Sequence, residues 1–208
     1  MMAPEPSQNK PEQKAYIVED DLSVGQALCD LFDSMGVSAR HFGSAEKFLD
    51  AWTDAMSGCL ILDVRLPGIS GMELQARMIE RGCQLPIIVM TAHGDIPMVR
   101  KALKAGAVEF LTKPFQDEEL LAAVKQAFEQ DRASRQTREV TDAIRARVAS
   151  LSERERQVIE MVTTGMTNRE IAAKLFLSVV TVKLYRRLAM EKMQAASLAD
   201  LVKMWEKI

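Results

Sequence analysis

The chain has 208 residues, which is too long for one typical domain and too short for three, so two domains are expected. Hydrophobic residues make up 48% and charged residues 27%, which excludes a mainly disordered chain. The net charge of −2 is unevenly distributed: residues 1–128 carry 12 basic and 18 acidic side chains, whereas residues 129–208 carry 15 and 11. The basic second part makes nucleic acid a candidate partner.

Targeting signals and cysteine chemistry point to the cytoplasm. Residues 1–14 are polar and contain no apolar core, so we expect a flexible tail without a secretory signal. No apolar stretch approaches the roughly 18 residues of a membrane span, so no membrane association is expected. Three widely separated cysteines, Cys29, Cys59 and Cys83, favour a reducing compartment over a disulfide framework or a zinc site.

Residues 15–130 alternate short apolar runs with amphipathic stretches. Strands are predicted at 15–18, 37–42, 59–62, 85–90 and 108–111, and helices at 22–35, 45–56, from 70 onward, 97–105 and 117 to about 130. Ser70 and Glu73 have the spacing of a capping box. This alternation predicts an α/β domain with a doubly wound, five-stranded parallel sheet.

The predicted strands end in polar side chains that could carry chemistry. In a parallel sheet, function sits at the carboxyl ends of the strands, where we expect one crevice to collect Glu19, Asp20, Asp21, Asp63, Thr91 and Lys113. Carboxylates from two strand ends suit Mg²⁺, and a carboxylate can attack phosphorus when cations neutralise the phosphoryl group. The residues alone therefore indicate a metal-dependent phosphate or carboxylate site.

Residues 131–149 are predicted to form a helical linker, because they are rich in charge and contain neither glycine nor proline. Val140, Ile144 and Val148 recur every fourth residue and form one thin apolar stripe. The stripe fits either a short coiled-coil seam or a spacer.

Residues 150–208 are predicted to be entirely helical. Ser152 with Glu155, and Thr167 with Glu170, have the capping-box spacing, and Gly165 suits the end of the first of these helices. Further helices are expected after Ser178, to about Met193, and after Ser197.

The helix that follows Ser178 suggests helix-turn-helix geometry. One face, formed by Val182, Tyr185, Ala189 and Met193, is expected to be core. On the other side, Leu184 could touch a thymine methyl group while Lys183 and Arg187 reach base edges or phosphates. Candidate DNA contacts are therefore Lys183, Leu184, Arg187, Arg186, Thr181, Val180, Arg169 and Ser178. A solvated basic face is the alternative.

Four motifs in the first part resemble a response-regulator receiver domain, whose fold is flavodoxin-like: 18–21, 62–68, 90–92 and 112–115. Residues 91–98 and 104–111 resemble the FixJ branch in particular. The resemblance implies that Asp63 accepts a phosphoryl group from a sensor histidine kinase, and that Lys113 bonds it. It also implies that Thr91 shifts toward the phosphoryl group and that the ring of Phe110 follows.

The same resemblance implies a Mg²⁺ site. Asp20 would bind the ion directly, Glu19 would help through water, Asp63 would contribute its carboxylate, and the backbone carbonyl of Arg65 would be a further ligand. Asp20 and Asp21 could serve in place of Glu19 and Asp20.

Residues 151–159, 165–172 and 177–183 resemble a LuxR-type DNA-binding module within 150–208. The sequence departs from that pattern at Tyr185, at the Leu188–Ala189 pair and at Ala196. Together the resemblances imply a FixJ/NarL-type response regulator. Phosphorylation would promote a homodimer through residues 97–111, promoter DNA would be bound, and RNA polymerase would be contacted.

Two rival functions fit parts of the pattern. A Mg²⁺-dependent phosphohydrolase could use Asp63 as its nucleophile, although enzymes of the haloacid dehalogenase type place a second aspartate where this chain has Arg65. A DNA-binding protein could use the first domain only as a dimerisation scaffold. We expect a regulator that is not an enzyme, apart from catalysing its own phosphorylation and dephosphorylation.

Overall fold

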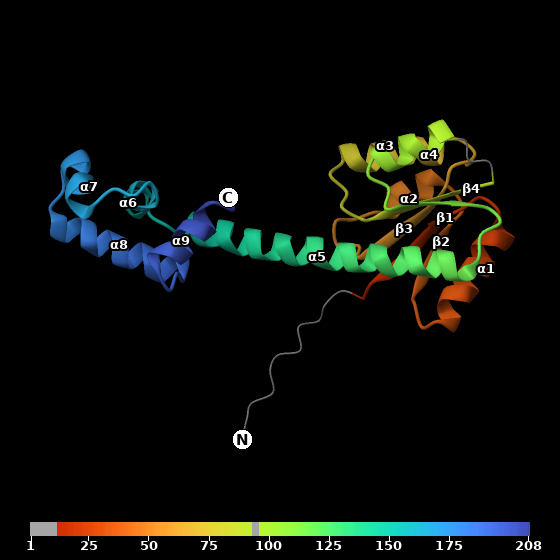
Figure 1. The fold of residues 1–208 in the computed structure, drawn as a ribbon, viewed down its shortest axis with the longest axis horizontal. Helices are drawn as coiled ribbons and strands as arrows, with labels where there is room; N and C mark the ends of the chain where they lie inside the picture. Colours follow the sequence, from red (N-terminus) through yellow and green to blue (C-terminus); the bar gives the residue numbers. More distant parts are fainter. Residues whose placement is uncertain (1–11, 93–95) are drawn as a thin grey trace, which may run out of the picture. The chain divides into compact units, whose positions relative to one another are not determined.

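The computed structural model describes residues 12–92 and 96–208, and the chain divides into two compact units between Ser134 and Arg135 (Figure 1). The predicted tail lies outside the described residues as far as residue 11. Gln13 and Lys14 were assigned to that tail, but they belong to the first unit. Lys14 begins the first strand, and the Gln13 amide donates a hydrogen bond to the carbonyl of Phe128 at 2.8 Å.

A five-stranded parallel sheet forms the centre of the first unit, in the order β2-β1-β3-β4-β5. Its strands are β1 (Lys14–Val18), β2 (Ala39–Phe42), β3 (Gly58–Asp63), β4 (Ile87–Thr91) and β5 (Glu109–Thr112). Every residue of β3 and β4 is buried, as expected for parallel strands that are covered on both faces. The order is that of a flavodoxin-like doubly wound fold, so the predicted fold class is confirmed.

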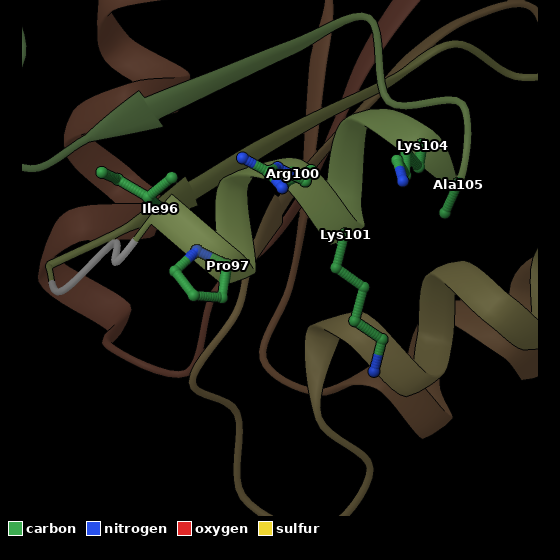
Figure 2. Close-up of a pocket in the computed structure, with 6 residues that line it drawn as sticks. All are labelled: Ile96, Pro97, Arg100, Lys101, Lys104 and Ala105. Carbon is green, nitrogen blue, oxygen red and sulfur yellow. The ribbon is translucent and has the colours of Figure 1, made fainter.

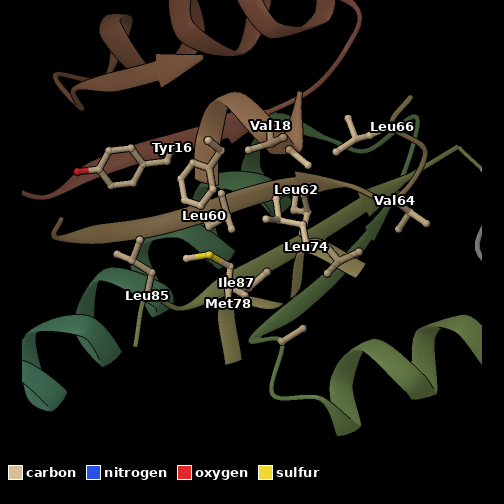
Figure 3. Close-up of a cluster of buried hydrophobic side chains, with 14 of the residues drawn as sticks. Tyr16, Val18, Leu60, Leu62, Val64, Leu66, Leu74, Met78, Leu85 and Ile87 are labelled. Carbon is tan, nitrogen blue, oxygen red and sulfur yellow. The ribbon is translucent and has the colours of Figure 1, made fainter. Parts of the chain in front are cut away.

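Helices cover both faces of this sheet: α1 (Leu22–Ser34), α2 (Ala45–Ala51), α3 (Gly71–Glu80), α4 (Ile96–Lys104) and α5 (Asp117–Ala149). Alternate strand residues point into two separate cores. One contains Leu60 and Leu62 with Leu74 and Met78 of α3 (Figure 3). The other contains Ile61 and Met90, packed against α1 and α5.

Two local predictions in the first unit need correction. The helix predicted over 45–56 ends at Ala51, because Trp52 takes an extended conformation with φ −69° and ψ 137°. Trp52 and Met56 still pack against the core, which explains their apolar spacing. Only half of the predicted box at Ser70 forms, since the Glu73 carboxylate pairs with Arg77 at 2.6 Å instead.

Helix α5 is one continuous helix from Asp117 to Ala149 and does not end near residue 130. Within the first unit its Asp131 is buried, and the carboxylate accepts hydrogen bonds from the Ser57 hydroxyl at 2.7 Å and the Gly58 N–H at 2.9 Å. These bonds fasten α5 to the start of β3.

The second unit contains the end of α5 and four further helices: α6 (Glu153–Thr163), α7 (Asn168–Leu175), α8 (Val179–Met193) and α9 (Leu198–Trp205). Both predicted capping boxes are present, and Ser178 and Ser197 cap α8 and α9. Ile144 of α5 is buried in this unit's core and Val148 packs against it, whereas Val140 is 44% exposed. Most of the apolar stripe is therefore used inside this unit.

Across the described residues, no helix combines the length and hydropathy that a transmembrane span requires.

Candidate functional sites

The acidic cluster lies at the carboxyl ends of β1 and β3. These strands are neighbours, and Val18 is paired with Leu62, so Glu19 and Asp63 follow side by side. Both carboxylates are buried. The ammonium group of Lys113, just after β5, lies 2.5 Å from an oxygen of each. The sheet thus brings together three residues that are far apart in the sequence.

The backbone around Asp63 holds its carboxylate in place. The second carboxylate oxygen accepts a hydrogen bond from the backbone N–H of Arg65 at 2.9 Å. Helix α3 begins directly against this turn, and a Cβ on Gly71 would lie 2.0 Å from the Asp63 carbonyl oxygen. Only glycine permits this approach, which fixes the loop behind the acid.

Charge is concentrated in this cluster. Burial raises the pKa of the Glu19 carboxyl, and the nearby Asp63 charge adds to this effect, although the hydrogen bond from Lys113 opposes it. Burial on its own would lower the pKa of Lys113, but the Asp63 and Glu19 carboxylates outweigh it and hold the pKa above its ordinary value. One permanent cation is thus shared between two buried carboxylates.

The neighbouring acids take different roles. Asp21 is the N-cap of α1, and its carboxylate accepts hydrogen bonds from the N–H groups of Ser23 at 2.8 Å and Val24 at 3.3 Å. Asp20 is exposed, and its side chain forms no hydrogen bond with any described residue. Of the two pairs of acids that the sequence left open, the pair Glu19 and Asp20 is the one not engaged in capping.

Sequence reasoning missed His41, whose ring nitrogen Nε2 lies 2.7 Å from the carbonyl oxygen of Glu19. The ring occupies space left by Gly25 in α1, where a Cβ would lie 2.4 Å from Nε2. A glycine inside a helix is unfavourable by about 1 kcal/mol relative to alanine, and that anomaly was the available signal. His41 thus supports the turn that carries Glu19 and Asp20.

Thr91 and Phe110 lie on the two strands beyond β3. Thr91 is fully buried at the end of β4, one residue past the Asp63–Met90 pairing. Phe110 of β5 is half-buried and packs against the core cluster of Leu60 and Leu62. Both sit at or near the same edge of the sheet as the acids.

In the described part of the chain, no three His, Cys, Asp or Glu side chains converge into a ready-made metal cage. The available donors are the buried carboxylates of Glu19 and Asp63, the exposed carboxylate of Asp20 and nearby backbone carbonyls. Mg²⁺ usually takes one or two carboxylates and keeps several waters, so this donor set fits it.

Hollows open beside these elements in the described part of the chain. One of about 320 Å³ opens beside Lys113 and is lined mainly by α1 and the loop after β5. Another, of about 570 Å³, runs along α4 and is shown in Figure 2, with Ile96, Pro97, Arg100, Lys101, Lys104 and Ala105 around it. Ile96 is 76% exposed and Leu103 on the same helix is 43% exposed.

In the second unit, α8 has the two faces that its sequence predicts. Val182, Ala189 and Met193 are fully buried and Tyr185 packs against the same core, so the predicted core face is confirmed. The exposed side carries Val180, Lys183, Leu184 and Arg187.

The other predicted DNA contacts differ in whether their side chains are hydrogen-bonded within this unit. The Ser178 hydroxyl caps α8 by accepting from the Thr181 N–H at 3.0 Å, and the two hydroxyls lie 2.8 Å apart. Arg186 donates to the Asn168 side chain at 3.2 Å. Arg169 is exposed on α7 and forms no hydrogen bond or ion pair with any described residue.

Two family models match this chain, one in each unit. The model for the response regulator receiver domain matches residues 15–125. The model for bacterial regulatory proteins of the luxR family matches residues 149–205.

Similar proteins cover nearly the whole chain. Nodulation protein W of Bradyrhizobium diazoefficiens is 45% identical over 93% of this chain and 85% of its own length. The response regulator protein TodT of Pseudomonas putida is 44% identical over 93% and 85%. The transcriptional regulatory protein FixJ of B. diazoefficiens is 43% identical over 91% and 92%.

Solved structures agree with these relatives. The response regulator StyR superposes with a TM-score of 0.86 at 41% identity, covering 95% of this chain and 100% of that one. Full-length FixJ from B. japonicum gives a TM-score of 0.57 at 41% identity, covering 94% and 97%. These matches favour a regulator over a phosphohydrolase. The chain therefore belongs to the FixJ-like two-component response regulators, which are transcription regulators that combine a receiver domain with a LuxR-type DNA-binding domain.

Proposed function

We propose that Asp63 is the phosphoryl acceptor of this regulator and that a sensor histidine kinase is the donor. The observation that carries the proposal is the buried Asp63 carboxylate bonded to Lys113 at the end of the central strand. One Asp63 oxygen forms a bond to phosphorus while the bond from phosphorus to the donor nitrogen breaks, and that nitrogen keeps the electron pair. The chain itself assists this transfer and the later hydrolysis of the acyl phosphate.

Lys113 and Thr91 assist the transfer. The Lys113 ammonium already lies against Asp63, so it can neutralise a phosphoryl oxygen as charge builds up there. Thr91 supplies a hydroxyl from the neighbouring strand. When Thr91 moves toward the phosphoryl group, it leaves space into which the Phe110 ring turns. These two coupled movements switch the domain between its two states.

A bound Mg²⁺ would neutralise charge on the phosphoryl oxygens. Asp20, Asp63 and the backbone carbonyl of Arg65 would hold the ion, and Glu19 would act through water. The geometry supports this, because the two buried carboxylates of Glu19 and Asp63 share one ammonium group, that of Lys113. The proposal leaves Asp21 out of the site, because its carboxylate accepts hydrogen bonds from the start of α1.

Phosphorylation would then promote a homodimer through residues 97–111. The exposed Ile96 and Leu103 and the hollow along α4 support this face. The receiver domain over 15–130, the linker over 131–149 and the DNA-binding module over 150–208 would act in sequence in the cytoplasm. The dimer would bind promoter DNA and contact RNA polymerase.

Promoter DNA would meet the exposed side of α8 and the start of α7. Lys183, Leu184, Arg187 and Val180 lie on that side, and the exposed Arg169 adds a backbone contact. Arg186, Thr181 and Ser178 are bonded within the unit, so they would reach only phosphates.

The substitution Asp63→Asn tests the phosphorylation step, with acetyl phosphate and Mg²⁺ as the donor mixture. The unaltered chain should gain the phosphoryl mass, dimerise in light scattering and bind DNA more tightly in gel shifts. Asp63→Asn should do none of these, whereas the exposed control Asp54→Asn should behave normally. Equal DNA binding by both chains, whatever the donor, would instead support a receiver domain that is only a scaffold.

A further inference from the structure

The exposed face of α8 carries two large apolar side chains in its first two turns. The side chain of Val180 is 77% exposed and that of Leu184 is 45% exposed, although both are hydrophobic. They are four residues apart and therefore lie one above the other on the same side of the helix. Val179, at the first position of α8, is 36% exposed.

The side chains beside this apolar pair are cations. Lys183, which directly precedes Leu184, is exposed beside this pair, and Arg187 continues the same side one turn later. The nearest acid on the helix is Glu191, 3.7 Å from Arg187. An apolar strip flanked by cations suits a polyanion with apolar groups in a groove, which points to duplex DNA rather than to an acidic or apolar protein surface.

The side chains that α8 offers limit which bases it can recognise. From Ser178 to Met190 the helix has no Asn, Gln, Asp or Glu, the side chains that read adenine or cytosine edges. The hydroxyls of Ser178 and Thr181 are engaged with each other at the helix start, and Arg186 is bonded to Asn168. The exposed side therefore presents two cations, Lys183 and Arg187, together with the apolar pair.

We propose that Val180 and Leu184 select thymine by covering its methyl group in the major groove. The C5 methyl of thymine is the one apolar group that a base edge presents there, and the start of a recognition helix is the part that reaches base edges. Lys183 and Arg187 then supply contacts to guanine or to phosphates. This inference rests on the proposed DNA-binding function and adds which base the helix prefers.

The first step of the test finds the DNA. The full chain, treated with acetyl phosphate and Mg²⁺, is used to select binders from a randomised duplex library. The best sequence is then synthesised with thymine or with uracil at each T·A pair in turn, because uracil lacks only the methyl group. Replacement at the contacted positions should weaken binding about fourfold per methyl, the equivalent of about 0.8 kcal/mol for one buried carbon group.

The variants Val180→Ala and Leu184→Ala assign the effect to these side chains. Each should lose the penalty for uracil at one position, as expected for two groups in contact. Ile79→Ala, an equally exposed apolar residue of α3 in the other unit, should keep the full penalty.

The outcomes separate the two proposals. If no sequence is enriched, the DNA-binding function fails and the thymine preference falls with it. If sequences are enriched but bind equally with thymine and with uracil, only the thymine inference is wrong. A uracil penalty that survives both alanine variants would also overturn it, since the effect would then come from DNA shape.

Discussion

Gly25 in α1 makes room for the His41 ring that bonds the Glu19 carbonyl. By helix propensity alone, Gly25→Ala should stabilise the protein by about 1 kcal/mol. We expect the opposite, a loss of about 1–3 kcal/mol, because the new methyl group collides with the ring and the helix must move. Because the two arguments predict opposite changes in the free energy of unfolding, a urea unfolding measurement distinguishes them.

Gly25→Ala should also slow the phosphorylation of Asp63 by acetyl phosphate, since the displaced ring no longer supports the turn of Glu19 and Asp20. The control Ala27→Gly removes a methyl group from an exposed position of the same helix and should leave the phosphorylation rate unchanged. A Gly25→Ala protein that is more stable than the original would show that the His41 ring can move aside without cost.

Phe176 ends α7 in a left-handed conformation, with φ 56°, and its ring is 96% exposed. A left-handed backbone costs a side-chain-bearing residue about 1–2 kcal/mol, and asparagine tolerates it better. The ring contributes nothing to the core of this unit. Phe176→Asn should therefore raise the midpoint of thermal unfolding, and a fall would mean that the ring makes stabilising contacts.

At the scale of elements, Glu155 connects two helices. Its carboxylate completes the capping box of α6 and lies 2.7 Å from the Lys192 ammonium of α8. Burial alone would raise the pKa of Glu155, but hydrogen bonds from Lys192 and the Ser152 backbone hold the pKa below its ordinary value of 4.5. Because the folded-state pKa is the lower one, this carboxylate stabilises the fold above about pH 4.5. That contribution is lost as the pH falls through the folded-state pKa.

The substitution Glu155→Gln isolates the charge, because glutamine can still complete a capping box. At pH 7 we expect a loss of about 1 kcal/mol in the free energy of unfolding, shrinking toward zero below pH 4. Urea unfolding across this pH range measures it, and Glu153→Gln, an exposed acid in the same helical turn, is the control. A loss that does not depend on pH would show that packing, not charge, is responsible.

The elements that the sequence predicted well carry strong local signals. The apolar runs of β3 and β4 and the capping serines of α6, α8 and α9 needed no tertiary information. Helix α5 was divided too early, because a change from apolar to charged composition looked like a boundary although no helix breaker follows residue 117 before Ala149. Tertiary packing decides such cases, as the buried Ile144 shows.

The residues of the candidate sites also differ in how well the sequence predicts them. Asp63 and Lys113 could be placed because strand ends meet at one edge of a parallel sheet. The contact of His41 was harder to predict, since the bond joins a side chain to a main-chain atom 22 residues away, and the glycine at position 25 was its one local signal. The sequence analysis placed Asp21 in the crevice, although an aspartate directly before a helix is a typical N-cap and its capping role could have been predicted.

Across the whole molecule, each unit has its own buried core, and α5 contributes residues to both. The proposed phosphoryl site and the proposed DNA face are built from different residues in different units. Substitutions on the DNA face should therefore leave the phosphoryl chemistry intact, and the effects of substitutions in the two units on stability should add.

The substitution Lys183→Ala tests this separation in the full chain. Lys183 is exposed and forms no hydrogen bond or ion pair with any described residue, so its removal should not disturb the fold. DNA binding should weaken while acetyl phosphate labels Asp63 at the normal rate. If Lys183 meets a phosphate, the slope of log affinity against log salt should fall by about one, and the loss should be uniform across sequences. If it meets a guanine edge, the loss should instead concentrate on sites with that base.

Lys203→Ala on α9 removes the same charge from the same unit and should change neither binding nor labelling. Unaltered DNA binding by Lys183→Ala would move the recognition surface away from this side of α8.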